Sequence, residues 1–328
     1  MPFASLISVA SWLPERRLSN ADLEKMVDTS DEWIRSRTGI GERRIAARGE
    51  ATSDLAARAG TLALERANLA PADVDMLVLA TSTPDKVFPS AACLAQAKMG
   101  LTCPAFDLNA ACTGFIYAID VATSIIESGR ARTVLVIGAD VLSSVIDYTD
   151  RSTCILFGDG AGAVVMQASD EPGVLGVHLG ADGTGEELLH VPAGGSALPL
   201  TPELIAAGAG YLKMNGNEVF KFAVRTIPEV ARQALAESGL TPADVDWLVP
   251  HQANQRITDT VAHRLGIPHE RVVCRIEDTG NTSAASIPLV LDSLYTDGHL
   301  APGNILALVG FGAGLTYGAA IIRWNRKD

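Results

Sequence analysis

The chain has 328 residues and a formal net charge of −12, with 26 basic against 38 acidic side chains. This length suffices for two ordinary domains or one large one with a buried core. The acidic balance argues against nucleic acid as a partner, because such binding neutralises phosphates with Lys and Arg. Residues 1–7 lack the basic flank and long apolar segment of a signal peptide, and no run reaches the length of a membrane span. We therefore expect neither secretion nor membrane insertion.

Five cysteines are spread along the chain without clustered spacing. An odd number of scattered cysteines argues for reduced thiols in the cytoplasm, not for a disulfide framework. No Cys-X-X-Cys pair or histidine cluster suggests a metal site. We therefore expect a cytoplasmic protein with no bound metal.

The chain repeats itself. Residues 69–78 (LAPADVDMLV) recur as residues 240–249 (LTPADVDWLV), an offset of 240 − 69 = 171. Each copy follows an amphipathic helical pattern and runs on into an apolar strand. The pattern predicts two α/β halves, about 1–170 and 171–328, packed as one body about a pseudo-two-fold axis.

The same offset connects two strand-to-helix junctions that are rich in small residues. It carries Cys112 onto Ser283 and Ala110 onto Asn281. Asn281 is therefore expected to occupy the position before the helix that Ala110 holds in the first half.

The first of these junctions, residues 106–115 (FDLNAACTGF), is typical of a buried strand that breaks into a helix. Cys112 is expected in the first turn of that helix, where unpaired backbone N–H groups and the macrodipole stabilise a thiolate. The small residues Ala110, Ala111 and Gly114 leave room for a ligand. On position alone, a catalytic nucleophile and a small buried core cysteine are both open.

A histidine occupies a similar junction in the second half. His251 follows the strand expected over 246–250, at the strand end where parallel α/β sheets place their chemistry. Packing about a pseudo-dyad would bring Cys112, His251 and Asn281 together, with His and Asn as neutral donors toward an oxygen that gains charge. Papain-like proteases use the same residue types. They would also show a Cys-Gly-Ser-Cys-Trp motif, a secretion signal and disulfides, which this sequence lacks.

Two glycine clusters, 158–162 and 310–314, lack Walker A spacing. The first also leads into strand-like residues instead of a helix, which argues against a dinucleotide fingerprint. We interpret both clusters as tight turns beside a site. Residues 185–210 carry loop signals and form the least regular part of the chain.

Eight motifs occur in order along essentially the whole chain: residues 29–34 (TSDEWI), 37–40 (RTGI), 88–93 (FPSAAC), 110–114 (AACTG), 157–162 (FGDGAG), 216–221 (GNEVFK), 249–254 (VPHQAN) and 280–286 (GNTSAAS). Together they resemble β-ketoacyl-acyl carrier protein synthase III. The resemblance implies the α/β thiolase fold, a duplicated five-layer αβαβα body, in a homodimer.

The resemblance also implies a two-stage condensation. Cys112 would attack an acyl-CoA substrate, with the first oxyanion held by its own N–H and by the turn that contains Phe311 and Gly312, which would also border the acyl pocket. Malonyl-acyl carrier protein would then lose CO₂ while His251 and Asn281 stabilise the enolate, which attacks the acyl-cysteine to give a 3-oxoacyl product. No cofactor is implied beyond the acyl-CoA substrate. Related thiolases and hydroxymethylglutaryl-CoA synthases carry Cys or Glu as the third group, so Asn281 favours decarboxylation over direct proton abstraction.

The resemblance also implies which residues bind CoA. Trp33 and Arg151 match positions that sandwich the adenine of CoA, and Arg37 matches one near its phosphates. The residues that match the pantetheine tunnel are Gly216, Phe220 and Asn254. Taken singly, these would be a helix-packing tryptophan and solvated arginines; within the motifs we favour the functional interpretation.

The resemblance further implies one site that contacts the carrier protein and one that contacts a partner subunit. The positions that match the carrier-protein docking segment are Gln252, Ala253, Asn254, Gln255 and Arg256. Arg256, His263 and Arg264 would share one helix face, a modest basic patch that could attract an acidic carrier protein, although a charged helix face is usually just solvated. Phe88 matches the residue of a partner subunit that closes the acyl pocket, and a bulky ring there favours a short primer such as acetyl.

The sequence departs from the family pattern at a few positions. Thr279 stands where a histidine is usual, and Ala313 and Leu315 stand where many members carry Gly and Phe. Three hypotheses follow: the initiating condensing enzyme of fatty acid synthesis, which we favour; a homologue in secondary metabolism that condenses or transfers another acyl group; and a non-enzymatic subunit of a larger synthase. The intact Cys-His-Asn set argues against the third.

Overall fold

The computed structural model describes residues 1–326, and most of its strands form two sheets. The first sheet has the order β1-β7-β6-β4-β5, in which β4 is parallel to β5 and β6, and β7 is antiparallel to β6 and β1. Its strands are Phe3–Trp12 (β1), Met76–Ala80 (β4), Ala105–Leu108 (β5), Thr133–Val141 (β6) and Asp159–Ser169 (β7).

The second sheet has the order β11-β12-β13-β8, with β11 parallel to β12 and the other pairs antiparallel. Its strands are Val174–Ala181 (β8), Trp247–Pro250 (β11), Ile305–Gly312 (β12) and Thr316–Arg323 (β13). Two small hairpin-like pairs lie outside the sheets: Arg16–Ser19 (β2) with Glu42–Ile45 (β3), and Leu189–His190 (β9) with Lys213–Met214 (β10).

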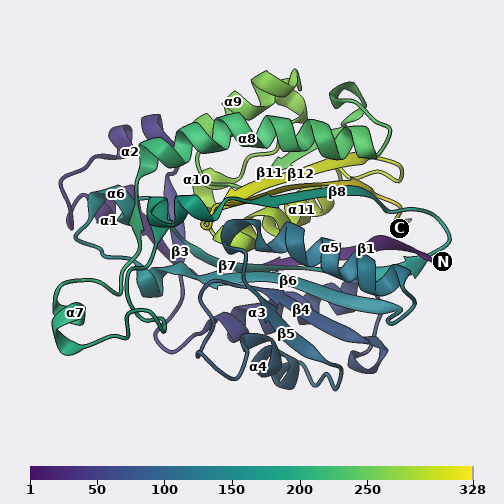
Figure 1. Cartoon of the computed structure of the whole chain (residues 1–328), viewed down its shortest axis with the longest axis horizontal. Coiled ribbons are helices and arrows are strands. Elements are labelled where there is room, and N and C mark those ends of the chain that lie inside the picture. Colours follow the sequence, from purple (N-terminus) through teal and green to yellow (C-terminus); the bar gives the residue numbers. More distant parts are fainter. Residues whose placement is uncertain (327–328) are drawn as a thin grey trace.

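Helices separate and cover the two sheets, which gives five layers (Figure 1). Helices α5 (Gly114–Glu127) and α11 (Ser286–Thr296) lie between the sheets. Helices α3 (Thr52–Arg66) and α4 (Ala91–Lys98) cover the outer face of the first sheet, while α8 (Gly216–Glu237) covers the second and carries α9 (Gln255–Leu265) beside it. This arrangement is the αβαβα body that the resemblance implied.

The remaining helical segments are short. They are α1 (Asn20–Leu23), α2 (Asp31–Thr38), α6 (Arg151–Cys154), α7 (Pro202–Ala206) and α10 (Ile276–Thr279), and the 3₁₀ segments Pro71–Asp73 (η1), Ala111–Thr113 (η2), Leu142–Val145 (η3), Gly183–Leu188 (η4), Pro242–Asp244 (η5), His269–Arg271 (η6) and Ser283–Ala285 (η7). Within residues 1–326, no helix is both long and apolar enough to cross a membrane.

The central strands and helices are apolar on all sides because other layers of the structure cover both of their faces. All nine residues of β6 are buried, as expected for a central strand with helices on both faces. In α5, Phe115, Ile116, Ala118 and Ile119 are fully buried although successive residues point in different directions around the helix. The site at the start of α5 is therefore held by a helix and a strand that are packed on all sides.

Each sheet is built from one half of the chain. Strands β1 to β7 all precede residue 170, and all strands of the second main sheet follow it. The predicted boundary between 1–170 and 171–328 therefore falls in the connection between β7 and β8.

The internal repeat shifts register by one residue, which corrects two predicted equivalences. The early elements keep the offset of 171, but η2 and η7 begin at Ala111 and Ser283, and 283 − 111 = 172. Both residues have positive φ, 47° and 52°. The Ala111 N–H bonds Asn109 Oδ1, and the Ser283 N–H bonds Asn281 Oδ1 in the same way. Asn281 thus corresponds to Asn109, not to Ala110, and Cys112 corresponds to the residue after Ser283.

The prediction of tight turns at both glycine clusters is only half right. Residues 159–162 lie within β7, whereas the second cluster ends β12 and turns after Gly312. A Cβ placed on Gly162 would lie 2.7 Å from Pro288 Cβ. The glycine is needed for close packing of α11 on β7, a reason that the local sequence does not reveal.

Candidate active site

Cys112 lies in the 3₁₀ turn η2 between β5 and α5. Because α5 starts at Gly114, the cysteine precedes the helix and does not lie in its first turn as predicted. The end of β12 approaches it closely: a Cβ on Gly312 would be 2.7 Å from the Cys112 amide nitrogen, so only glycine fits. The N–H of Cys112 and the backbone of Gly312 are thus adjacent, as the two sides of an oxyanion hole must be.

Burial controls the acidity of this thiol. Cys112 is 8% exposed, and its burial raises the pKa to about 12; a hydrogen bond from the Ser283 side chain opposes this rise, and the charge of Asp140 adds to it. The predicted stabilised thiolate is therefore wrong for the substrate-free site, because desolvation disfavours the charged form more than the nearby donors favour it. Cys112 is a thiol at neutral pH.

His251 follows β11 and is 4% exposed. Burial lowers its pKa to about 3, so the imidazole is neutral. Its Nδ1 lies 2.7 Å from Ser286 Oγ, which also accepts the Gln252 N–H. We assign the Ser286 proton to Nδ1, which leaves Nε2–H as a donor. Phe311 packs edge-on against the imidazole ring of His251, with 5.8 Å between the two ring centroids.

Asn281 lies between α10 and η7 and is 5% exposed. Its backbone N–H bonds Leu156 O at 2.9 Å, and its C=O accepts the Gly158 N–H at 3.0 Å. Its side-chain Oδ1 accepts the Ser283 N–H at 2.9 Å. Since the oxygen is engaged, the side-chain amide is oriented with its NH₂ group available as a neutral donor.

One cavity of about 110 Å³ brings the three predicted catalytic residues together. Cys112, His251 and Asn281 all line it, with Phe311 and Gly312. A second cavity of about 200 Å³ meets the first at Cys112 and is walled by aliphatic side chains of η3 and of the region around β9. The sulfur thus lies where a reaction chamber adjoins an apolar pocket.

A third cavity of about 240 Å³ adjoins the reaction chamber on the other side and opens toward α2. It shares its lining residues Gly216, Phe220 and Asn254 with the chamber, and adds Trp33 and Arg37. The predicted pantetheine and nucleotide positions therefore lie on one path that ends at Cys112.

Trp33 is already stacked with cations. The guanidinium groups of Arg151 and Arg37 lie 4.9 Å and 5.2 Å from its ring centroid. An adenine between Trp33 and Arg151 therefore requires Arg151 to move, and its half-exposed side chain leaves it room to do so.

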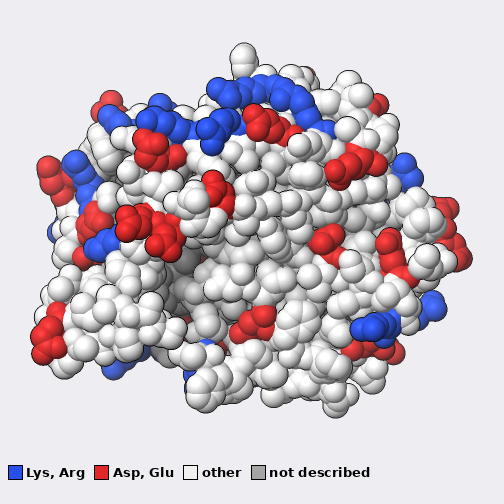
Figure 2. Space-filling view, viewed as in Figure 1, with Lys and Arg blue, Asp and Glu red and all other residues white. Residues whose placement is uncertain are grey.

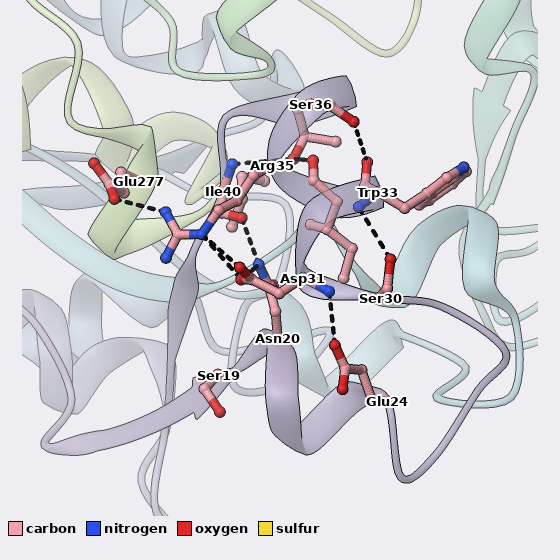
Figure 3. A network of polar contacts seen from close by, with 12 residues as sticks. Ser19, Asn20, Glu24, Ser30, Asp31, Trp33, Arg35, Ser36, Ile40 and Glu277 are labelled. Carbon is pink, nitrogen blue, oxygen red and sulfur yellow. Dashed lines mark hydrogen bonds and ion pairs between the residues drawn. The ribbon is translucent and has the colours of Figure 1, made fainter.

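A polar network on the opposite face of α2 fixes this platform (Figure 3). Ser30 caps the helix by accepting the Trp33 N–H at 3.1 Å, while Arg35 joins Asp31 to Glu277 of α10. Trp33 points away from these charges. A separate cavity of about 600 Å³ lies on this charged side, and Cys112 is not among its lining residues.

The predicted docking segment is only partly accessible. Gln252 is 1% exposed, and its amide bonds Pro250 O and the Arg275 N–H. Its side chain therefore cannot meet a carrier protein, which corrects that assignment. Arg256, by contrast, is exposed at the start of α9, over the ring of Phe220.

Basic residues form a longer ridge than the sequence suggested. Figure 2 shows Lys and Arg side chains gathered along one side of the molecule, over α8 and α9. The exposed members are Lys221, Arg225 and Arg232 of α8, and Arg256 and Arg264 of α9. The spacing of the α8 residues, 221, 225 and 232, places them on one helix face, a signal that was present in the sequence and was missed.

Phe88 is exposed and borders none of the three cavities described here. The structure thus leaves it apart from Cys112 of its own chain. Sequence reasoning gave no role to Asp140, Ser283 or Ser286. Ser283 and Ser286 stand within the motif 280–286, whereas no local pattern marks Asp140, because its neighbours come from other elements.

The site is that of a condensing acyltransferase, with a cysteine nucleophile and two neutral donors in a buried chamber. Two family models match the chain, both of 3-oxoacyl-[acyl-carrier-protein] synthase III: one over residues 106–183 and its C-terminal part over residues 235–324. The β-ketoacyl-[acyl-carrier-protein] synthase III of Thioalkalivibrio sulfidiphilus is 49% identical over 99% of this chain and 100% of its own. That of Caldanaerobacter subterraneus is 50% identical over 98% of each. The chain belongs to this family.

Solved structures agree. The 3-oxoacyl-[acyl-carrier-protein] synthase III of Aquifex aeolicus has a TM-score of 0.91 at 47% identity, and covers 98% of this chain and 99% of its own. The corresponding Pseudomonas aeruginosa enzyme has a TM-score of 0.92 at 44% identity, over 99% of each chain. A priming β-ketosynthase of a polyketide pathway has a TM-score of 0.93 but 39% identity. The fold is therefore shared with an enzyme of a polyketide pathway, whose sequence is less identical to this chain than those of the Aquifex and Pseudomonas synthases.

Proposed function

We propose that this enzyme condenses a short acyl-CoA with malonyl-acyl carrier protein and so initiates fatty acid synthesis in the cytoplasm. The observation that carries the proposal is the single buried chamber lined by Cys112, His251 and Asn281. The products are a 3-oxoacyl-carrier protein, CO₂ and CoA. Acyl-CoA enters as a substrate, and no metal or other cofactor takes part.

In the first stage, Cys112 attacks the acyl thioester and CoA leaves. The developing oxyanion lies against the Cys112 N–H, beside the Gly312 backbone. The CoA nucleotide lies on the Trp33 platform, and its pantetheine arm follows the path past Phe220 and Asn254.

In the second stage, malonyl-carrier protein enters the same chamber. Decarboxylation leaves an enolate whose oxygen needs donors that remain neutral, because a charged imidazolium would protonate the carbanion. Burial keeps His251 neutral, and Asn281 presents its NH₂ group. The enolate carbon then attacks the acyl-Cys112 carbonyl.

The acyl group is short. The apolar pocket beside Cys112 holds about 200 Å³, less than the 300–1,000 Å³ of typical drug-sized ligand sites. In a homodimer, Phe88 of a second copy would close this pocket, which accounts for a phenylalanine that is 83% exposed in the single chain.

Mass spectrometry of the intact protein tests the proposal. Incubation with acetyl-CoA should add one acetyl group to wild type and none to Cys112→Ser, and malonyl-carrier protein should then remove the adduct as 3-oxobutyryl-carrier protein forms. Labelling by longer acyl groups alone, or an adduct that malonyl-carrier protein does not discharge, would assign the enzyme to secondary metabolism.

A further inference from the structure

A buried cation that takes no part in the chemistry above lies next to the segment that carries Asn281. Arg43, on β3, is fully buried. Its Nη1 donates to Leu18 O at 3.2 Å and to Asn20 Oδ1 at 2.8 Å, and its Nη2 donates to Ile155 O at 2.5 Å. Each of these acceptors is an uncharged oxygen. Burial lowers the pKa of Arg43 to about 10, so the guanidinium is still charged at neutral pH.

Stability does not account for this arginine. A buried charge held by uncharged groups is costly, and the Nε–H of Arg43 has no acceptor among the described residues. Apolar side chains of similar volume often replace buried ionic groups with no loss of stability. The use of a charged group here therefore lies in the segments that its hydrogen bonds join.

The Ile155 carbonyl leads into the segment that holds the main chain of Asn281. Leu156 O accepts the Asn281 N–H at 2.9 Å, and Asn281 O accepts the Gly158 N–H at 3.0 Å. These two hydrogen bonds fix Asn281 against this segment as a short parallel bridge. By holding Ile155 O, Arg43 sets the position of the segment and, through it, that of Asn281.

The side-chain stem of Arg43 packs against both segments of this bridge. A Cβ placed on Gly158 or on Gly280 would lie 3.0 Å from Arg43 Cβ. On Gly280 it would also lie 2.8 Å from Leu156 O, and the φ of Gly280 is 65°, so glycine is required beside Asn281. The arginine therefore contacts one segment through its stem and its guanidinium, and the other through its stem.

Asn20 fixes the other end of the guanidinium. The Asn20 Nδ2 donates to Asp31 Oδ1 and to Ile40 O, each at 2.8 Å (Figure 3). Because this amide nitrogen is engaged, Oδ1 is the atom that is directed toward Nη1 of Arg43. The guanidinium is therefore anchored on one side by Asn20 and on the other by Ile155 O.

We propose that Arg43 is a positioning residue for Asn281, which it places so that the side-chain NH₂ group meets the enolate oxygen. This inference rests on the proposed function, because Asn281 acts in the second stage of the reaction. Arg43 is not among the lining residues of the reaction chamber, so it acts through the main chain of Asn281 and not on the substrate. The groups of the first stage, the Cys112 N–H and the Gly312 backbone, belong to η2 and β12, away from the bridge that Arg43 holds.

Two rates measured on Arg43→Met test this role: acylation of Cys112 by acetyl-CoA, and removal of the acetyl group by malonyl-carrier protein, both followed by rapid-quench mass spectrometry. Methionine keeps an apolar stem against the glycines but makes none of the hydrogen bonds to Leu18, Asn20 and Ile155. Removal of the acetyl group should slow by about 100-fold, the effect of a displacement of about 1 Å, while acylation changes by no more than about twofold. Equal slowing of both reactions would show a general loss of structure and would contradict the proposal.

A double variant separates positioning of Asn281 from an independent effect of Arg43. If the arginine acts through Asn281, the substitutions Arg43→Met and Asn281→Ala share one effect. The double variant should then remove the acetyl group as slowly as Asn281→Ala alone, within about twofold. A further loss of about 100-fold in the double variant would mean that Arg43 acts on another group, and would overturn the proposal.

Arg43→Lys decides the question if Arg43→Met does not fold. Lysine keeps the charge but lacks the planar fork that bonds Asn20 and Ile155 at once. Removal of the acetyl group should slow by about tenfold, the size of one hydrogen bond to a charged group, with acylation unchanged; a wild-type rate of removal would contradict the proposal. The matched control is Arg44→Met, the same change at the next residue of β3, whose guanidinium bonds Pro14 O; it should alter neither rate by more than about twofold.

Failure of the positioning role is distinguishable from failure of the proposed function. If acetyl-CoA labels Cys112 and malonyl-carrier protein removes the label equally fast in wild type and in Arg43→Met, the positioning role is wrong and the function stands. If no acyl-CoA labels wild-type Cys112, the proposed function is wrong and the role of Arg43 is wrong with it.

Discussion

At the scale of single residues, the site depends on groups kept neutral by burial. Cys112 and His251 shift in opposite directions, to pKa values of about 12 and about 3, for the same physical reason: a charge is costly without water. The pair is therefore thiol and imidazole, not thiolate and imidazolium. A neutral imidazole is what an enolate-stabilising donor requires.

The neutral histidine should be visible in the stability of the protein. The folded-state pKa of His251 lies below the unfolded value, so the unfolded chain binds more protons between about pH 3 and 6.5, and stability falls as pH decreases through that window. Between pH 7.5 and 5.0 the contribution is about 2 kcal/mol. The His251→Gln protein has no titrating side chain at this position. Its free energy of unfolding, measured with denaturant, should therefore fall by about 2 kcal/mol less than that of wild type between pH 7.5 and 5.0. An identical pH dependence in both proteins would show that folding leaves the pKa of His251 unchanged and would contradict a neutral, buried imidazole.

At the scale of elements, hydrophobic pattern and repeat predicted most of the architecture. The strands around β6 and β12 and the helix after Cys112 follow from apolar runs and their terminating glycines. Two details did not follow. The one-residue change in repeat offset arises between β11 and η7, and the glycines of β7 serve packing against α11, a contact far away in sequence. Cys112 and His251 could be predicted because they follow the ends of strands, and Asn281 because it stands in the motif 280–286. The place of Asp140 could not, because only the packing of η7 on β6 brings it beside the site.

The basic ridge of Lys221, Arg225, Arg232, Arg256 and Arg264 is formed by two adjacent helices, α8 and α9. Within a chain of net charge −12, it offers an acidic carrier protein a local field of the opposite sign. Arg225→Glu on α8 should lower kcat/KM for malonyl-carrier protein by roughly tenfold at low salt, with the effect shrinking as salt is added. Acylation by acetyl-CoA should be unchanged.

Arg130→Glu, an exposed change of the same sign near the end of α5, is the matched control and should leave both reactions unaltered. Equal losses of kcat/KM for malonyl-carrier protein in Arg225→Glu and Arg130→Glu would mean that net charge, and not the α8 ridge, governs the association with the carrier protein. A loss of acylation in Arg225→Glu would instead place this residue on the acyl-CoA path.

At the scale of the whole molecule, the first sheet ends in an open edge. Among the described residues 1–326, strand β5 has a neighbour on one side alone, β4, and its Phe106 side chain is 37% exposed. An unpaired edge with exposed apolar side chains invites pairing with another chain. Phe88 is exposed at 83%, and it is the residue expected to enter the acyl pocket of a second copy. A dimer formed through this edge would pair β5 and bring Phe88 of one copy to the acyl pocket of the other.

Phe106→Glu should therefore yield a monomer in sedimentation analysis, because it places a charge on the edge that two copies would bury. If Phe88 closes the partner's pocket, the monomer should also lose its preference for acetyl over longer acyl-CoAs in Cys112 labelling. Phe3→Glu is the control: Phe3 is 42% exposed on β1, the opposite edge strand of the same sheet, and its replacement should leave the dimer and its selectivity intact. If the Phe106→Glu protein is still a dimer, the two copies do not pair through β5. If it is a monomer with unaltered selectivity for acyl-CoA, Phe88 of a second copy does not close the acyl pocket.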